Sequence, residues 1–255
     1  MSDSDPCGLL KRKFIPLAGN VYASRYFANI VYDEFALDLM DQIDQSEEWL
    51  DEFSEFDLLT YAVESMHKDM VTEQFLVDHY DGTVVELECG LDPLFDRNDN
   101  DHALFMSIDD SSSIALREKY IPRDEREIYI PCSIFDEQWI NDVIKYSDGR
   151  SVLIHAIHVF QNYTYSEVLS LLRKLWQIPK VSILFDIEPI AKISDGFAVK
   201  DLDAFLKELS NFNLNTISDF YENVNDRKGM KAKTKLSMTL SDYNESRRVL
   251  YLGGL

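Results

Sequence analysis

The fold is decided by the stretch SVLIHAIHVFQNYTYSEVLSLLRKLWQIPKVSILFDIE, residues 151–188. It begins with a continuous apolar run, Val152 to Phe160, and ends with a second one, Val181 to Ile187. Between the two runs, Thr164 and Glu167 have the spacing of a capping box, which starts a helix. Continuous apolar runs are typical of strands that are covered on both faces. The stretch therefore predicts a β-α-β unit with two parallel internal strands.

Upstream of this unit, apolar residues at three- and four-residue steps predict two helices, at 23–45 and 46–67. They would pair as an antiparallel hairpin with two acidic outer faces. A short helical piece at 72–78 and a half-buried strand at 83–88 follow, because the alternation then changes to a period of two.

The remaining segments are expected to complete a mixed structure. Strands are expected at 103–108, 114–119, 127–130, 233–240 and 247–252, and helices at 133–144, 201–212 and 216–224. The predicted fold class is α+β: an acidic N-terminal helical hairpin, and a mixed β-sheet with one βαβ unit and a C-terminal β-hairpin. We divide the chain into an acidic portion, 1–110, and a mixed α/β portion, 111–255, with one continuous domain, 14–255, as the alternative.

Negative charge is concentrated in one part of the chain. Between Asp33 and Asp110 there are 24 Asp and Glu residues and two basic residues, Lys68 and Arg97, in a chain of net charge −21. Aromatic residues are interleaved with the carboxylates, which argues against a disordered acidic tail. A field of one sign repels nucleic acid and attracts basic surfaces. We therefore expect a basic protein partner, with no direct contact to nucleic acid or membrane.

This charge favours a binding protein over an enzyme. The predicted function is an intracellular protein that neutralises a basic partner, as an immunity protein, an antitoxin-type inhibitor or a nucleic-acid mimic does. Carboxylates on rigid elements would supply steering and selectivity, and an aromatic anchor would supply affinity. The predicted partner-binding residues are Asp41, Asp44, Glu47, Glu48, Trp49, Asp51, Glu52 and Glu55. A structural subunit of a larger assembly, bound through the same hairpin, is an alternative.

A metal-dependent hydrolase or nuclease is the other alternative. Asp186 and Glu188 follow the second core strand, and polar residues at strand ends line ligand crevices in α/β sheets. They are the catalytic candidates, although Pro189 interrupts the pattern that such a nuclease would need.

The loop 92–102 alternates acidic and amide residues as a calcium loop does, but Asp101 stands where that loop needs glycine. A solvated acidic loop is the preferred interpretation, and Asp96, Asp99 and Asp101 are the metal-ligand candidates that it offers. His155 and His158 would point to opposite faces of one strand, which disfavours a shared metal. We predict no metal site and no cofactor.

Other chemistries lack their sequence patterns. With nine glycines in the chain, we find no glycine-rich phosphate loop and no nucleophile elbow. The three cysteines are widely spaced, which indicates reduced thiols. The sequence shows no signal-peptide pattern and no apolar run of membrane-spanning length, so we expect a cytoplasmic protein.

Overall fold

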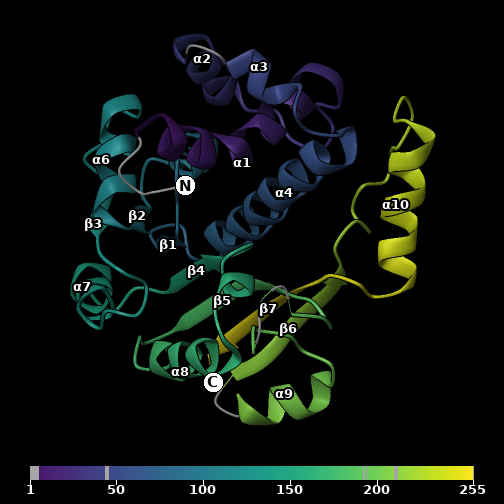
Figure 1. The fold of residues 1–255 in the computed structure, drawn as a ribbon. Helices are drawn as coiled ribbons and strands as arrows, with labels where there is room; N and C mark the ends of the chain where they lie inside the picture. Colours follow the sequence, from purple (N-terminus) through teal and green to yellow (C-terminus); the bar gives the residue numbers. More distant parts are fainter. Residues whose placement is uncertain (1–5, 44–45, 192, 194, 210–211, 255) are drawn as a thin grey trace.

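The computed structural model describes residues 6–43, 46–191, 193, 195–209 and 212–254, and these build one seven-stranded sheet in the order β3-β2-β1-β4-β5-β7-β6 (Figure 1). The strands are β1 Thr83–Leu87, β2 Leu104–Asp109, β3 Glu127–Pro131, β4 Val152–Ala156, β5 Val181–Ile187, β6 Phe212–Asp219 and β7 Arg248–Gly254. All neighbouring pairs from β3 to β5 are parallel, and β7 runs antiparallel to both β5 and β6.

This sheet corrects the predicted fold class. The protein has a Rossmann-like, doubly wound α/β fold and not an α+β fold with a separate helical hairpin. The β-α-β unit is confirmed: β4 and β5 pair in parallel, and Thr164 caps the intervening helix through the backbone N–H of Glu167. The prediction gave the sheet only one such unit, whereas the unit is one repeat of a parallel winding that runs from β3 to β5.

Helices cover both faces of the sheet. On one face, α7 (Gln138–Ser147), α8 (Tyr165–Leu175) and α9 (Leu202–Glu208) pack on alternate residues of the central strands. On the other face lie α4 (Glu55–Asp78), α5 (Leu94–Asn98) and α10 (Ala232–Tyr243). Because both faces are covered, β1 is buried along its whole length, whereas the sequence predicted a half-buried strand.

The N-terminal helices differ from their prediction. The region predicted as two helices contains α1 (Pro6–Tyr26), α2 (Glu34–Gln42), α3 (Ser46–Leu50) and the start of α4. The first predicted helix is interrupted because the Asp33 side chain caps α2 by accepting from the backbone N–H of Ala36. Ser54 caps α4 in the same way, and α4 then runs through the short helical piece expected at 72–78. Helix α1 packs along α4, so the paired helices are α1 and α4.

In three segments the structure has a helix where a strand was predicted, or a strand where a helix was predicted. Residues 114–119 lie in α6 (Ser111–Tyr120), which begins where Asp110 accepts two backbone N–H groups. Residues 216–219 belong to β6, a polar strand that pairs with β7. Residues 233–240 form part of α10, in which Thr234 and Met238, four apart, are the buried positions. The predicted C-terminal hairpin is therefore wrong, since the first of its two predicted strands is part of a helix.

Part of the acidic stretch is neutralised inside the protein. Arg97 contacts the carboxylates of Asp33, Asp69 and Asp92 at 2.9, 2.9 and 2.7 Å. Lys68 contacts Asp92 as well, and Glu86 of β1 at 2.7 Å. The two basic residues of this stretch thus lie at the centres of buried ion-pair clusters, which join α4 to the loop after β1. A buried charge requires such partners.

Candidate active site

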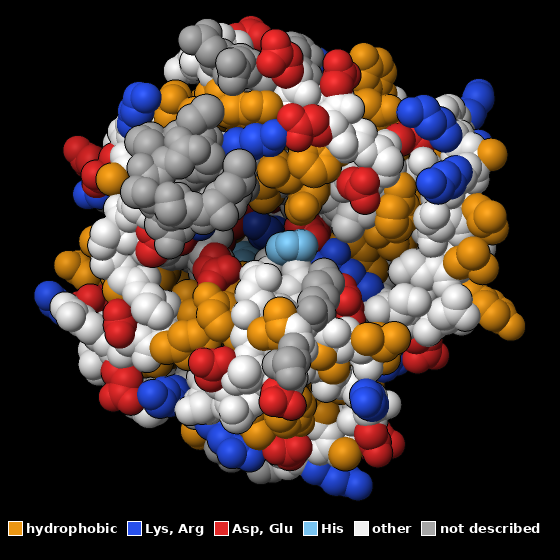
Figure 2. Space-filling view, in the orientation of Figure 1, with side chains coloured by type: hydrophobic (Ala, Val, Ile, Leu, Met, Phe, Trp, Pro, Cys, Tyr) orange, Lys and Arg blue, Asp and Glu red, His pale blue; other side chains and the backbone are white. Residues whose placement is uncertain are grey.

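The carboxyl edge of the parallel strands is the expected ligand site of a doubly wound sheet. Ligands of this architecture bind where the strand order reverses, and here the reversal lies between β1 and β4. The described loops at this edge bring together residues that follow β1, β2, β4 and β5. Figure 2 shows the corresponding face hollowed near its centre, with a histidine side chain beside acidic and basic ones.

The corner between β1 and β2 is built around Asp109, the last residue of β2. Its carboxylate accepts from the backbone N–H of Gly90 at 3.0 Å and from Lys13 Nζ at 3.0 and 2.7 Å. Beside it, the hydroxyl of Tyr163 donates to the carboxylate of Glu88. Burial raises the pKa of both Glu88 and Tyr163. The corner therefore contains two carboxylates and one lysine from α1.

Left-handed backbone marks both loops at the switch point. Glu88, after β1, has φ +52°, and His158, after β4, has φ +65°. Residues with a Cβ rarely adopt this conformation, and such strain concentrates at functional sites. In both cases the side chain that accompanies the strained backbone is polar and ionisable.

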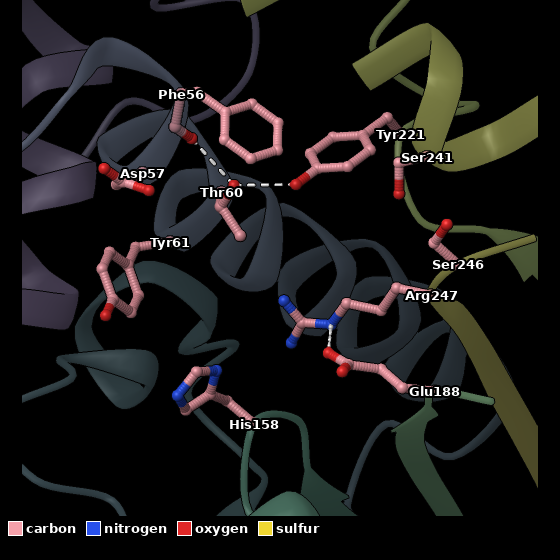
Figure 3. A pocket seen from close by; sticks show the side chains of 10 residues that line it. All are labelled: Phe56, Asp57, Thr60, Tyr61, His158, Glu188, Tyr221, Ser241, Ser246 and Arg247. Atoms are coloured by element: carbon pink, nitrogen blue, oxygen red, sulfur yellow. Dashed lines mark hydrogen bonds and ion pairs between the residues drawn. The ribbon is translucent and has the colours of Figure 1, made fainter. Parts of the chain in front are cut away.

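A cleft of about 300 Å³ adjoins this edge above β4 and β5 (Figure 3). Its lining comes from α4, from the loops after β4 and β5, and from the segments around α10 and β7. The ten lining residues are Phe56, Asp57, Thr60, Tyr61, His158, Glu188, Tyr221, Ser241, Ser246 and Arg247. A cleft of this size accommodates a small organic molecule.

His158 is the residue in this cleft best placed for acid–base chemistry. Its Nδ1 lies 2.9 Å from Glu64 Oε1 of α4, and its side chain is 38% exposed. Burial alone would raise the pKa of Glu64, but the charges of His158 and Arg247 outweigh it and lower the pKa to about 2. An ionised carboxylate on Nδ1 orients a histidine ring and leaves Nε2 to exchange protons.

Arg247 fixes the floor of the cleft. Its guanidinium donates to Glu64 at 2.8 Å and to Asp186 at 2.7 Å, and its Nε lies 4.0 Å from Glu188. It also lies 3.9 Å from the ring centre of Phe220. The second oxygen of Asp186 accepts the backbone N–H of His158 at 2.7 Å. Asp186 thus holds the strained turn that carries the histidine.

The hydroxyl group of Thr60 ties Tyr221, one ring of the aromatic wall of the cleft, to α4. Thr60 Oγ1 donates to the backbone oxygen of Phe56 at 2.8 Å and lies 2.7 Å from the hydroxyl of Tyr221. Because the proton of Thr60 is already used, Tyr221 donates in the second bond. The rings of Phe56 and Tyr221 are 5.7 Å apart, and Figure 3 shows Tyr61 across the cleft from them.

The two predicted catalytic candidates are both at this site, but they differ in exposure. Glu188 lines the cleft, whereas Asp186 is 5% exposed and both of its oxygens are bound within the protein. The nuclease alternative loses its support here, because Asp186 is buried and its two oxygens hold the His158 backbone and Arg247 in place. Among the described residues, no group of three or more His, Cys, Asp or Glu side chains is arranged to hold a metal ion.

The loop residues considered as metal ligands lie elsewhere. Asp99 is paired with Arg126, and Asp101, at φ +66°, donates its backbone N–H to Asp99. Burial, followed by the charge of Glu127, raises the pKa of Asp96 to about 6. Of these three carboxylates, that of Asp99 forms an ion pair with Arg126 and accepts the turn hydrogen bond from Asp101.

The predicted partner-binding residues are spread over α2, α3, the following turn and the start of α4. Asp41, Glu48, Asp51 and Glu52 are exposed, and Glu52 pairs with Lys11 at 2.6 Å. Trp49 is 6% exposed and packs on Phe14, and Glu55 is also buried, where it accepts the backbone N–H of Lys231. Asp44 and the side chain of Glu47 lie outside the described residues. Trp49 is therefore a core residue and not an exposed anchor.

Comparisons with solved structures identify the fold. The chain is similar to a protein from Thermobifida fusca YX that is provisionally assigned as a methyltransferase, with a TM-score of 0.57, 13% identity and 99% of each chain covered. It is also similar to magnesium protoporphyrin IX methyltransferase from Synechocystis PCC 6803 with bound SAM, with a TM-score of 0.52, 11% identity and 80% and 85% of the two chains covered. No family model and no curated protein matches the chain.

These similarities overturn the predicted function. The chain has the fold of SAM-dependent methyltransferases, and the compared structures give no support to an immunity protein, an antitoxin, an inhibitor or a nucleic-acid mimic. The charge pattern led to a wrong prediction, because several of the carboxylates form ion pairs inside the protein and others lie exposed on the surface of an α/β fold. Within the part of the chain that the structure describes, no helix has the length and apolarity needed to cross a membrane.

Sequence reasoning missed most of this site. His158 was placed in a strand, but β4 ends at Ala156 and the histidine lies in the turn beyond it. Glu88 and Asp109 could have been found from the sequence, because Glu88 follows one apolar run and Asp109 ends the next. Asp109 also lies about 20 positions after the first turn, where nucleoside-binding α/β folds carry an acidic residue. No sequence pattern marks Lys13 or Glu64 as a site residue, since only the packing of α1 and α4 brings them to the sheet edge.

Proposed function

We propose that this chain is a methyltransferase that takes its methyl group from SAM and transfers it to a small molecule in the His158 cleft. The observation that carries the proposal is the His158–Glu64 pair, which opens into a cleft at the switch point of a sheet with methyltransferase topology. Neither the fold nor the cleft would suffice alone, since one fold serves many functions.

The corner between β1 and β2 has the chemical groups that an adenosyl ligand needs. Asp109 offers a carboxylate at the end of β2, where nucleoside-binding α/β folds bind a ribose. Gly90 leaves room beside it, because a Cβ at that position would meet only Lys13, at 3.5 Å. With Glu88 the corner has two carboxylates and one lysine, a balance that suits a sulfonium cation.

Two contacts must change for such a ligand to bind. Lys13 covers both oxygens of Asp109, and Tyr163 covers the carboxylate of Glu88. We assign Lys13 as the group that a bound ribose displaces. It is partly exposed and comes from α1, so its side chain can leave without disturbing the sheet.

The remaining chemistry belongs to the cleft. SAM supplies an electrophilic methyl group on a positively charged sulfur. His158 Nε2 accepts the proton that the acceptor molecule loses, and Glu64 stays ionised and stabilises the charged imidazole. Arg247 and Asp186 hold this pair in place, while Phe56, Tyr61 and Tyr221 exclude water from the acceptor.

Calorimetric titration with SAM and with its demethylated product, S-adenosylhomocysteine, tests the donor site. We expect both to bind, and Asp109→Asn to weaken binding by about 10- to 100-fold, the effect of losing a hydrogen bond to a charged group. Asp203→Asn, an exposed position on α9, is the matched control and should bind as the native chain does. Lys13→Met should bind more tightly, because Asp109 no longer has to be uncovered.

His158→Asn tests the acid–base role, since asparagine tolerates the left-handed backbone. Product formation should fall by about 10²- to 10⁴-fold with unchanged affinity for SAM. The proposal is refuted if neither the native chain nor Lys13→Met binds SAM or S-adenosylhomocysteine at millimolar concentration.

A further inference from the structure

We infer that the His158 cleft binds an organic ammonium ion with an apolar body, so that the methyl acceptor is an amine. This inference rests on the proposed function for its catalytic part, but the binding of the cation does not depend on it. Three properties of the cleft support this assignment: its charge, its aromatic rings and the position of its base.

Negative charge predominates around the floor of the cleft. Arg247 is shared between two buried carboxylates, Glu64 and Asp186, so the arginine and these two carboxylates together carry one formal negative charge. Asp57 lines the cleft and adds another. The side-chain hydrogen bonds of Asp57 go to Ser54, a neutral residue, so its charge is not neutralised by them. These carboxylates attract a cation to the cleft and disfavour a carboxylate ligand.

The aromatic rings are arranged to receive that cation. Phe56, Tyr61 and Tyr221 present three rings around the cleft, and an ammonium group is attracted to the face of such rings. The hydrogen bond with Thr60 holds the Tyr221 side chain in position before any ligand arrives, and the Phe56 ring packs 5.7 Å from the Tyr221 ring. Burial raises the pKa of Tyr221 to about 12, so its ring stays a neutral phenol. Preorganised walls reduce the entropy lost on binding.

His158 lies where an ammonium group needs a base. Its ring centre is 5.8 Å from that of Tyr61, so it lines the same cleft as the aromatic wall. An ammonium nitrogen has no lone pair and must lose one proton, which His158 Nε2 would accept. The nitrogen lone pair then forms the new N–CH₃ bond, and the electron pair of the broken S–CH₃ bond stays on the sulfur as an uncharged thioether. The imidazolium returns its proton to solvent.

Binding of simple probes to the native chain without any methyl donor tests the inference. We would titrate 2-phenylethylammonium, its neutral analogue 2-phenylethanol and its anionic analogue 3-phenylpropanoate, and follow each by calorimetry or ligand-observed NMR. The ammonium probe should bind at least 10-fold more tightly than the alcohol, and the carboxylate more weakly than both. Added salt should weaken only the ammonium complex appreciably.

Variants locate the effect in the cleft. Phe56→Leu should weaken the ammonium complex by at least fivefold, whereas Phe53→Leu, a half-buried phenylalanine that does not line the cleft, should leave it unchanged. Both variants should retain a cooperative thermal transition. Equal binding of the three probes, or equal effects of the two variants, would overturn the inference. Ammonium binding without any SAM binding would refute the methyltransferase proposal alone, and SAM binding without ammonium preference would refute the cation site alone.

Discussion

Replacing Glu64 by glutamine tests the central arrangement of the site, because this one carboxylate contacts both His158 and Arg247. Glu64 Oε1 lies 2.9 Å from His158 Nδ1 and 2.8 Å from a guanidinium nitrogen of Arg247. Glutamine keeps the size of the side chain and one carbonyl oxygen, but it removes the charge. Arg247 is then left with Asp186 as its close carboxylate partner.

The pKa of Glu64 gives the size of the effect. His158 and Arg247 outweigh the cost of burial and hold the pKa at about 2, against an ordinary value of 4.5. At 1.36 kcal/mol for each tenfold change in proton affinity, this is about 3 kcal/mol of stability. Because the folded-state pKa is the lower one, the contribution is fully present above pH 4.5 and is lost as the pH falls towards 2. Glu64→Gln should lack it at every pH.

Urea unfolding from pH 7 to pH 2.5 measures this contribution. At pH 7 the variant should be about 3 kcal/mol less stable than the native chain, with a melting temperature lower by about 6–12 °C for a chain of this size. The difference should shrink below pH 4.5 as the native carboxylate takes up its proton. Glu188→Gln, a partly exposed neighbour in the same cleft, should change little. A constant difference across this pH range, or none at pH 7, would refute the assigned ion-pair geometry.

Three further substitutions test the packing that positions the site. Gly19→Ala would place a Cβ 2.5 Å from the backbone oxygen of Leu58, so α1 must move from α4, and thermal unfolding should show a loss of about 1–3 kcal/mol. Trp139→Phe removes the indole N–H that donates to the backbone oxygen of Ile134 at 2.9 Å, and should cost about 1–3 kcal/mol in urea unfolding. Ser54→Ala removes the N-cap of α4 and should cost about 1 kcal/mol, with a loss of amide protection confined to the first turn of that helix. A native-like result for any of these would contradict the corresponding contact.

The acidic composition of this chain illustrates how far a charge pattern can be interpreted. The segregation of carboxylates between 33 and 110 is a property of the sequence, and so is their interleaving with apolar residues. The pattern does not show which carboxylates meet Lys68 and Arg97, because their partners lie on separate elements, from α2 to the loop after β1. Ion pairs between distant residues have no fixed spacing along a chain.

The sequence by itself determined the central β-α-β unit, the positions of β1, β2, β3, β5 and β7, and the capping box of α8, since these follow from local periodicity and side-chain hydrogen bonding. The tertiary structure alone decided the rest. The polar strand β6 exists because β7 pairs with it, and α10 forms where period-two polarity would favour a strand. Tertiary packing also assembles the site, because α4 brings Glu64, the start of β7 brings Arg247 and α1 brings Lys13 to one edge of the sheet. The chemistry of the site therefore depends on contacts that no local pattern encodes.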